Sequence, residues 1–309
     1  EEHGAVWTTQ RQACLTVTSP VFYAPQVAVL GHSEVGPVSL RAALSEGSAP
    51  QDGDDLTTQI RIDHLRPALV QIVGEEAKHA VRVQRLKPGA DVDLVDGLGL
   101  RVKGKVTEDP EQGKAGGRGE TVLTVEVLQV QDHPPARPGL TLVQALAKNG
   151  RDEQAIETAT ELGVGTVVPW QAERCIVRWD SRKKPTRWQR VLLAAMKQSR
   201  RATLPALTAA VTSNELAERI RQGTLRGELV LVCHESAAQK LSAVLTDEGL
   251  DERQEVTVIV GPEGGITDSE LQELMDAGAK PVLLGPHVLR SSTAGPAALA
   301  AINLAAGNW

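Results

Sequence analysis

The stretch VIVGPEGGIT, residues 258–267, places three glycines and a proline directly after a run of β-branched apolar residues. A strand that ends in a turn would account for Gly261, because turns favour glycine. It would not by itself account for Gly264 and Gly265, nor for the helix signal that follows at once. The pattern raises the question of whether this loop holds a ligand, and of which kind.

Ligands of open α/β sheets bind beyond the carboxyl ends of the strands, and Gly285-Pro286 is a second glycine turn that follows a predicted strand. The chain has neither the G-x-G-x-x-G pattern nor the P-loop pattern of phosphate sites. Thr267-x-x-Glu270 is a capping box, which uses amide donors that a phosphate would otherwise bind. A ligand without phosphates, held by backbone contacts, fits these features, and a purely structural turn fits them equally well.

Strand and helix patterns alternate in the second part of the chain, which predicts a parallel sheet covered on both faces. The predicted strands are 140–146, 165–170, 228–233, 255–260 and 280–285, and the predicted helices are 152–163, 186–200, 237–249, 268–278 and 293–306. Before a linker at 132–139, short strands at 68–73, 91–97, 100–106 and 121–130 alternate with Gly-rich turns and a helix within 74–89. This first part predicts a small β-barrel or sandwich, so the chain has a β-rich domain followed by an α/β domain.

Composition excludes several classes of protein. A chain of 309 residues is long enough for two domains, and no apolar run approaches the roughly 18–20 residues of a membrane span. Its three cysteines are widely separated, which predicts neither disulfides nor a metal site and favours a reducing cytoplasm. The net charge is −6, yet residues 174–201 contain ten basic residues and one acidic residue. A solvated face and a polyanion-binding surface are equal explanations of that stretch.

Two segments are expected to lie outside the packed domains. Residues 1–18 open acidic and lack the apolar core of a secretory signal, which predicts a disordered extension. Residues 31–60 are rich in Gly, Ser, Pro and Asp without sustained periodicity, which predicts a long surface insertion.

Four segments together resemble one family. VIVGPEGGITDSEL, followed by VLLGPHVLRSSTAGPAALAAI, is similar to the paired C-terminal motifs of the SPOUT (α/β-knot) methyltransferases. The resemblance is closest to the 16S ribosomal RNA (uracil-N3)-methyltransferases. ALAKNGRDEQAIETATELGVGTVVPWQAERCIV and GEEAKHAVRVQRLKPGADVDLVDGLG also match that family, in the family's order, and SPVFYAP (19–25) fits its first strand.

The resemblance implies a PUA-like RNA-binding β-barrel over 19–134 and an α/β domain with a trefoil knot over 138–309. It implies a cytoplasmic homodimer that uses S-adenosyl-L-methionine, without a metal or a membrane, to methylate N3 of a uridine in the 16S rRNA of the small subunit. The implied cofactor-binding residues are Gly261, Gly264, Gly265, Leu284, Gly285 and Leu289. Arg290 matches the family's Leu-Arg pair and would stabilise the uracil deprotonated at N3.

Further residues carry a predicted role from the same resemblance. Glu153 would orient the uracil or take its proton, although an acid favoured by the helix dipole explains it as well. The RNA-binding candidates are His79, Arg82, Arg85, Lys148, Arg151, Arg200 and Arg201. Spacings of three place the first three of these along one helical face.

The chain also departs from the family pattern. Thr158 stands where the family usually has Lys, and Lys197-Gln198 where it often has Glu-Gln. Two alternatives remain: a SPOUT ribose 2′-O-methyltransferase, and a non-catalytic RNA-binding ribosome-assembly factor. The first usually has Asn near its last loop, where this chain has Arg290-Ser291-Ser292-Thr293, and the second would have no need of the glycine loops.

Overall fold

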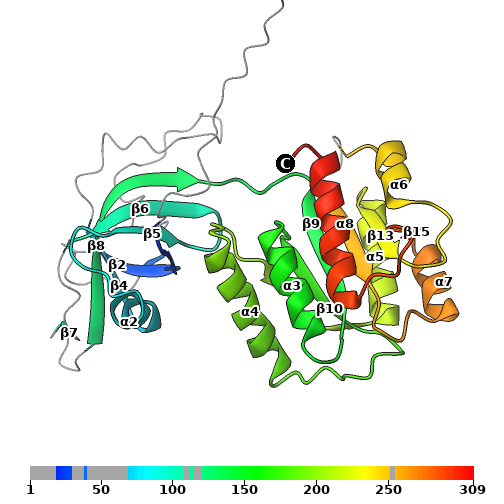
Figure 1. The fold of residues 1–309 in the computed structure, drawn as a ribbon, viewed down its shortest axis with the longest axis horizontal. Coiled ribbons are helices and arrows are strands. Elements are labelled where there is room, and N and C mark those ends of the chain that lie inside the picture. The colour runs from blue at the N-terminus through cyan, green and yellow to red at the C-terminus, as the bar shows by residue number, and fades with distance from the viewer. Residues whose placement is uncertain (1–18, 30–37, 40–68, 108–111, 114–119, 251–254) are drawn as a thin grey trace, which may run out of the picture.

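The computed structural model describes residues 19–29, 38–39, 69–107, 112–113, 120–250 and 255–309. These residues form a curled N-terminal sheet and a C-terminal parallel sheet with its helices, which lie side by side in Figure 1. The predicted extension at 1–18 lies outside the described residues. So does the predicted insertion at 31–60, apart from the short strand β3 (Val38–Ser39).

The N-terminal sheet contains eight strands within the described residues, in the order β1-β5-β6-β8-β4-β2-β3, with β7 also paired to β8. Besides β3 they are β1 (Val21–Tyr23), β2 (Gln26–Val29), β4 (Leu69–Val73), β5 (Asp91–Val95), β6 (Leu100–Val106), β7 (Gln112–Gly113) and β8 (Glu120–Asp132). β1 runs parallel to β5, and the other pairs are antiparallel. Period-2 burial along β6 and β4 gives one apolar face, so the alternation read from the sequence is confirmed.

Helix α2 (Glu75–Arg82) packs on β4 and β8, over a core that includes Phe22, Leu94 and Leu123. It ends earlier than the sequence suggested. Arg85 lies beyond the helix with a positive φ of 50°, and the chain turns there so that Leu86 packs against the core. The prediction that Arg85 shares a helical face with His79 and Arg82 is therefore wrong.

The C-terminal sheet contains seven parallel strands within the described residues, in the order β11-β10-β9-β14-β13-β15, with β12 also paired to β10. They are β9 (Gly139–Ala145), β10 (Thr166–Gln171), β11 (Ala206–Leu207), β12 (Val211–Thr212), β13 (Leu229–Cys233), β14 (Glu255–Val260) and β15 (Lys280–Val282). Successive residues are buried along β9, β10, β13 and β14. Both faces of the sheet are therefore covered, as predicted.

Six helices accompany this sheet in the described part of the chain: α3 (Arg151–Glu161), α4 (Lys184–Gln198), α5 (Ser213–Leu225), α6 (Leu241–Glu248), α7 (Asp268–Asp276) and α8 (Ser291–Ala305). α3 packs against both α4 and α8 (Figure 1). α5 was not predicted, although Thr212 and Glu215 form a capping box at its start. That box was the available sequence signal for this helix.

Helix α4 also joins the two sheets. Met196 and Ala202 form a small apolar cluster with Val21 and Val95 of the N-terminal unit. The Leu204 amide donates a hydrogen bond of 2.8 Å to the carbonyl of Gly97. The arrangement of the two units is thus held by apolar packing and by backbone hydrogen bonds.

The strand order places β14 between β9 and β13, with β15 next to β13. The segments after β13, β14 and β15 therefore leave the same edge of the sheet as neighbours. The trefoil knot stays a prediction, because strand order alone does not define how the chain threads through itself.

Candidate functional site

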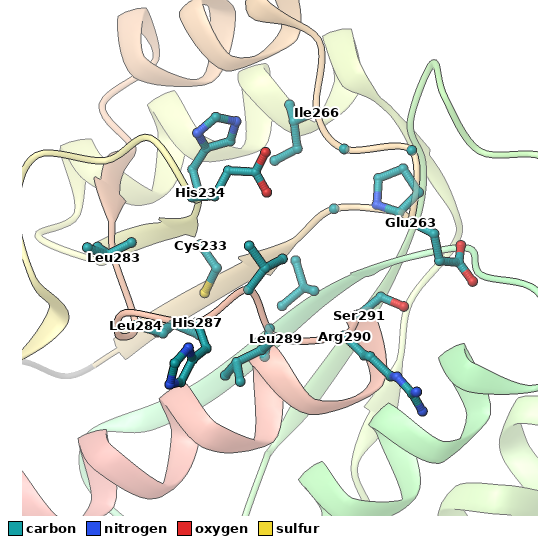
Figure 2. A pocket seen from close by; sticks show the side chains of 18 of the residues that line it. Cys233, His234, Glu263, Ile266, Leu283, Leu284, His287, Leu289, Arg290 and Ser291 are labelled. Carbon is teal, nitrogen blue, oxygen red and sulfur yellow. The ribbon is translucent and has the colours of Figure 1, made fainter.

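A cavity of about 480 Å³ lies at the carboxyl ends of β13, β14 and β15. Figure 2 shows His234 and Ile266 on one side of it and His287 and Leu289 on the other. The residues predicted to bind the cofactor all line it, and they are Gly261, Gly264, Gly265, Leu284, Gly285 and Leu289. Arg290 lines it as well. The structure thus brings together two loops that are some twenty residues apart in the sequence, as expected at this edge of an α/β sheet.

Each glycine of the first loop has its own geometric reason. A Cβ on Gly261 would lie 2.6 Å from Cγ1 of Ile266, and one on Gly264 would lie 3.1 Å from Cβ of Arg174. Gly265 has a φ of 77°, in the region that favours glycine, and its amide donates to the carbonyl of Pro262 at 2.9 Å. The loop is therefore a tight turn packed against its own chain, and the same turn exposes backbone to the cavity.

The helix that follows this loop starts with the predicted capping box. Thr267 accepts from the amide of Glu270, and Glu270 accepts from the amide of Thr267. The buried Glu270 carboxylate also accepts from the Glu173 amide at 2.8 Å and from the Ser213 hydroxyl at 2.6 Å. Burial raises the pKa of Glu270, but these hydrogen bonds outweigh it and leave the pKa below its ordinary value. Glu270 thus ties the loop to the segment before Arg174 and to the start of α5.

The second loop, between β15 and α8, is more open. A Cβ built on Gly285 would meet no atom of the described residues within 4 Å. Arg290 is the N-cap of α8, and its exposed guanidinium extends away from the centre of the cavity in Figure 2. The next residue, Ser291, is buried and lines the cavity, and its hydroxyl has no hydrogen-bond partner among the described residues. A buried hydroxyl without a partner is costly, so this group is suited to bind a polar ligand atom.

Sequence reasoning missed the part of the cavity that follows β13. Cys233, His234 and Glu235 line it, and so does His287 of the second loop. Burial raises the pKa of the Cys233 thiol to about 12, so this cysteine is a neutral, apolar wall at physiological pH. The strand ending at Cys233 was predicted, but only the strand order places its end beside β14.

Arg151 lines the cavity, and Lys148 precedes it in the segment where β9 leads into α3. The Lys148 amide donates to Oε1 of Glu263 at 3.1 Å, and Nη1 of Arg151 lies 3.6 Å from the same oxygen. Arg174 also lines the cavity, and its guanidinium donates to the carbonyl of Gly264 at 3.2 Å. Two arginines therefore contact the glycine loop, Arg151 at Glu263 and Arg174 at Gly264.

Glu153 does not line the cavity. Its carboxylate, largely buried, lies 2.6 Å from Nε of Arg187 on α4. The neighbouring Asp152 is fully buried and accepts from Nζ of Lys184 at 3.0 Å. These two ion pairs hold the start of α3 against α4, so the placement of Glu153 favours a structural role over the predicted role as a base.

The remaining predicted RNA-binding residues separate into two groups. His79, Arg82, Arg85 and Arg200 are exposed or half-buried at the surface. Arg201 instead donates to the carbonyls of Thr160 and Val164 at 2.7 and 2.8 Å. Burial lowers the pKa of Arg201 to about 10, which leaves it charged at neutral pH. Its guanidinium closes the end of α3 and is committed to that structural role.

Two further features of the described residues bear on function. Among them no group of three His, Cys, Asp or Glu side chains is placed to hold a metal ion. No helix in the described part of the chain is long and apolar enough to cross a membrane.

Comparisons with known protein families match both units. A family described as the RNA methyltransferase domain matches residues 135–303, and one described as the RNA methyltransferase PUA domain matches residues 72–114. The chain is 40% identical over 245 residues to ribosomal RNA small subunit methyltransferase E of Mycobacterium bovis, covering 78% of this chain and 88% of the relative. The protein of that name from Bacillus subtilis is 28% identical over 75% of this chain and 88% of its own length.

Solved structures show the same fold. A putative methyltransferase from Legionella pneumophila, in complex with the cofactor SAM, is 26% identical and superposes with a TM-score of 0.64, over 77% of this chain and 92% of that one. A ribosomal RNA small subunit methyltransferase E from Neisseria gonorrhoeae, bound to S-adenosyl methionine, gives a TM-score of 0.68 at 24% identity, over 93% of this chain and 98% of that one. The PUA-like unit and the α/β methyltransferase unit are therefore those of known RNA methyltransferases.

Proposed function

This chain belongs to the ribosomal RNA small subunit methyltransferase E family, within the SPOUT methyltransferases, and we propose that it methylates N3 of a uridine in 16S rRNA with S-adenosyl-L-methionine as methyl donor. The observation that carries the proposal is the cavity built by the two glycine loops, with Arg290 at its edge. The family membership supports methylation of small-subunit rRNA, and the N3 position rests on the resemblance of the sequence motifs.

The residues of the cavity fit S-adenosylmethionine. Val260, Leu284 and Leu289 offer apolar contact for the adenine ring. The buried hydroxyl of Ser291 lacks a partner among the described residues and could bind a polar atom of the ligand, and Gly285 leaves free space beside its backbone. When bound, the cofactor supplies an activated methyl group on a sulfonium ion.

The chain's own residues would then position the base and stabilise charge. Methyl transfer forms a bond to N3 of uracil while the sulfur–methyl bond breaks, and the N3 proton passes to solvent. The guanidinium of Arg290 would stabilise the negative charge that develops on the uracil oxygens. In-line approach of N3 to the methyl carbon is a matter of positioning, which can supply much of the rate.

Glu153 enters this proposal as a positioning residue. Its ion pair with Arg187 holds the start of α3, from which Arg151 reaches the cavity. Glu153→Gln is expected to raise the KM for the RNA substrate while the dependence of kcat on pH keeps its shape. If Glu153 were instead the general base, Glu153→Gln would remove one limb of the kcat–pH profile.

The proposal includes a homodimer in the cytoplasm, in which the partner chain completes each site. Two inactive variants mixed in solution would test this arrangement. If the partner contributes a residue to each site, a mixture of Arg290→Ala with a variant altered at that contributed residue will form mixed dimers with one intact site and recover part of the activity.

The deciding experiment is a labelled-methyl transfer assay. Small ribosomal subunits from cells that lack the activity are incubated with the protein and S-adenosylmethionine, beside naked 16S rRNA. Nucleoside digestion and mass spectrometry then identify the product. We expect 3-methyluridine in the subunit sample. A 2′-O-methylated nucleoside would support the ribose methyltransferase alternative, and absence of cofactor binding by calorimetry would leave the non-catalytic RNA-binding factor.

A further inference from the structure

A second hollow lies between the two units, away from the glycine loops. It has a volume of about 510 Å³ and is lined by β1 with the residues before it, by α2 with the turn after it, and by α4. None of the cavity residues around Gly261 lines it. We call this hollow the interdomain groove and define it by Phe22, His79, Gln84, Arg190, Gln198 and Arg200.

The chemistry of the interdomain groove is that of a site for a single nucleotide. Leu193 and Ala194 contribute apolar surface, and the half-buried ring of His79 packs edge-on to the fully buried Phe22 beneath it, with centroids 6.2 Å apart. Gln84 and Gln198 each bring a side-chain amide, which can donate to and accept from the edge of a base. A volume of this size is within the range of roughly 300–1,000 Å³ that small-molecule sites occupy.

The charge of the groove is positive. Arg190 and Arg200 both line it and are exposed, and none of its described lining residues is acidic. Among the described residues, Arg190 has no acidic partner. Lys197, which also lines the groove, is bound to Glu76 at 2.8 and 3.1 Å and is neutralised there. The net effect is a concave site with apolar walls, base-reading amides and an arginine available to a phosphate.

We propose that the interdomain groove binds one unstacked nucleotide of single-stranded RNA next to the target nucleotide. The inference rests on the proposed function, since it takes the substrate to be RNA. Unpaired bases can be splayed into a pocket and read on their edges, whereas the bases of an RNA duplex are stacked and paired. Because the walls come from both units, a nucleotide held here fixes the RNA relative to the cavity at the glycine loops.

The test measures binding of a fluorescently labelled single-stranded RNA nonamer that contains one 4-thiouridine, and of the same sequence in a duplex. Arg190→Gln is compared with Arg219→Gln, a matched change at an exposed position of α5 outside the groove. We expect Arg190→Gln to weaken binding of the single strand by about tenfold and to reduce the slope of log K against log[salt] by about 1. Arg219→Gln should stay within about twofold, and cofactor binding should be unchanged in both.

Photo-crosslinking localises the contact. We expect the 4-thiouridine to crosslink to the peptide that contains His79 and to the peptide of α4 that contains Gln198. Equal affinity of the two arginine variants, or crosslinks confined to other peptides, would overturn the inference. Duplex RNA that binds as tightly as the single strand and responds equally to Arg190→Gln would also overturn it, because phosphate contacts alone would then explain the groove.

The two proposals fail separately. If the wild-type protein produces 3-methyluridine but Arg190→Gln changes neither RNA affinity nor the KM for subunits, the inference about the interdomain groove is wrong. The proposed function then stands. If the groove binds single-stranded RNA as expected but no methylated nucleoside forms, the proposed function fails and the groove remains an RNA site.

Discussion

Gly261 and Gly285 line the same cavity but differ in what surrounds them. Gly261 is packed against Ile266, whereas a Cβ on Gly285 would have open space around it. The first glycine is therefore required by the fold of its loop. The second is available to the ligand, since a side chain there would occupy space in the cavity without disturbing the protein.

This difference predicts opposite behaviour of two alanine variants. Gly261→Ala should lower the free energy of unfolding by about 1–3 kcal/mol, because the added methyl group overpacks the turn. Gly285→Ala should change it by less than about 0.5 kcal/mol and still weaken cofactor binding by about tenfold, or 1.4 kcal/mol. Chemical denaturation and calorimetric titration measure the two quantities. Normal cofactor affinity of Gly285→Ala would show that the ligand does not approach this loop.

Arg290 is an exposed residue at the start of α8, and its change is expected to affect chemistry rather than folding. If it stabilises the uracil anion, Arg290→Ala should lower the single-turnover rate of methyl transfer by about 10²–10³. The affinity for S-adenosylmethionine should stay within about twofold. Arg290→Lys keeps the charge without the planar fork and should recover part of the rate. A rate unchanged in Arg290→Ala would remove this residue from the mechanism.

At the scale of the element, helix α7 is held to its surroundings by one carboxylate. Glu270 closes the capping box with Thr267 and accepts from Glu173 and Ser213 as well. The glycine loop leads directly into this helix. A single buried side chain thus fixes the loop, the start of α5 and the segment that carries Arg174.

Glu270→Gln should destabilise the protein by about 2 kcal/mol at pH 7, because the amide group presents donors where the carboxylate accepts. The pKa of Glu270 in the folded state lies below its ordinary value of 4.5. The stability that the ionised Glu270 contributes is therefore complete above pH 4.5 and is lost as the pH falls through the pKa of the folded state. The difference in unfolding free energy between wild type and variant should narrow below about pH 4.5. Urea titrations over pH 3–7 test this, and a constant difference would contradict it.

At the scale of the whole molecule, the two units are joined by α4 and by the segment after it. Met196 and Ala202 pack against Val21 and Val95, and the ion pair of Lys197 with Glu76 spans the boundary. Lys197 is also one of the positions at which the chain departs from the family pattern. In this protein the lysine therefore connects the two units through its ion pair with Glu76.

A double-mutant cycle on Lys197→Met and Glu76→Gln should give a coupling energy of about 1 kcal/mol, since both side chains are largely buried. The exposed pair of Arg221 and Glu218 on α5 is the control and should give a clearly smaller coupling energy, because solvent screens it. Equal coupling in the two cycles would mean that the interdomain pair adds nothing beyond a surface ion pair.

Most elements of this protein were predictable from local pattern. The strands 100–106 and 255–260 have the predicted bounds, and the capping box at Thr267 forms as expected, because periodicity and capping depend on near neighbours along the chain. The glycine loops were also identified, and the six residues that the family motifs predict to bind the cofactor all line the cavity.

The tertiary structure decided what local pattern does not contain. The order of the strands puts Cys233, His234 and Glu235 beside the glycine loops, which no spacing in the sequence indicates. In the folded structure Arg201 donates to a carbonyl at the end of α3, and Glu153 forms an ion pair with Arg187. Both residue types would also suit an active site, so the sequence alone did not indicate these structural roles. Such contacts join residues far apart in the chain, so they depend on how whole elements pack and only the folded structure can define them.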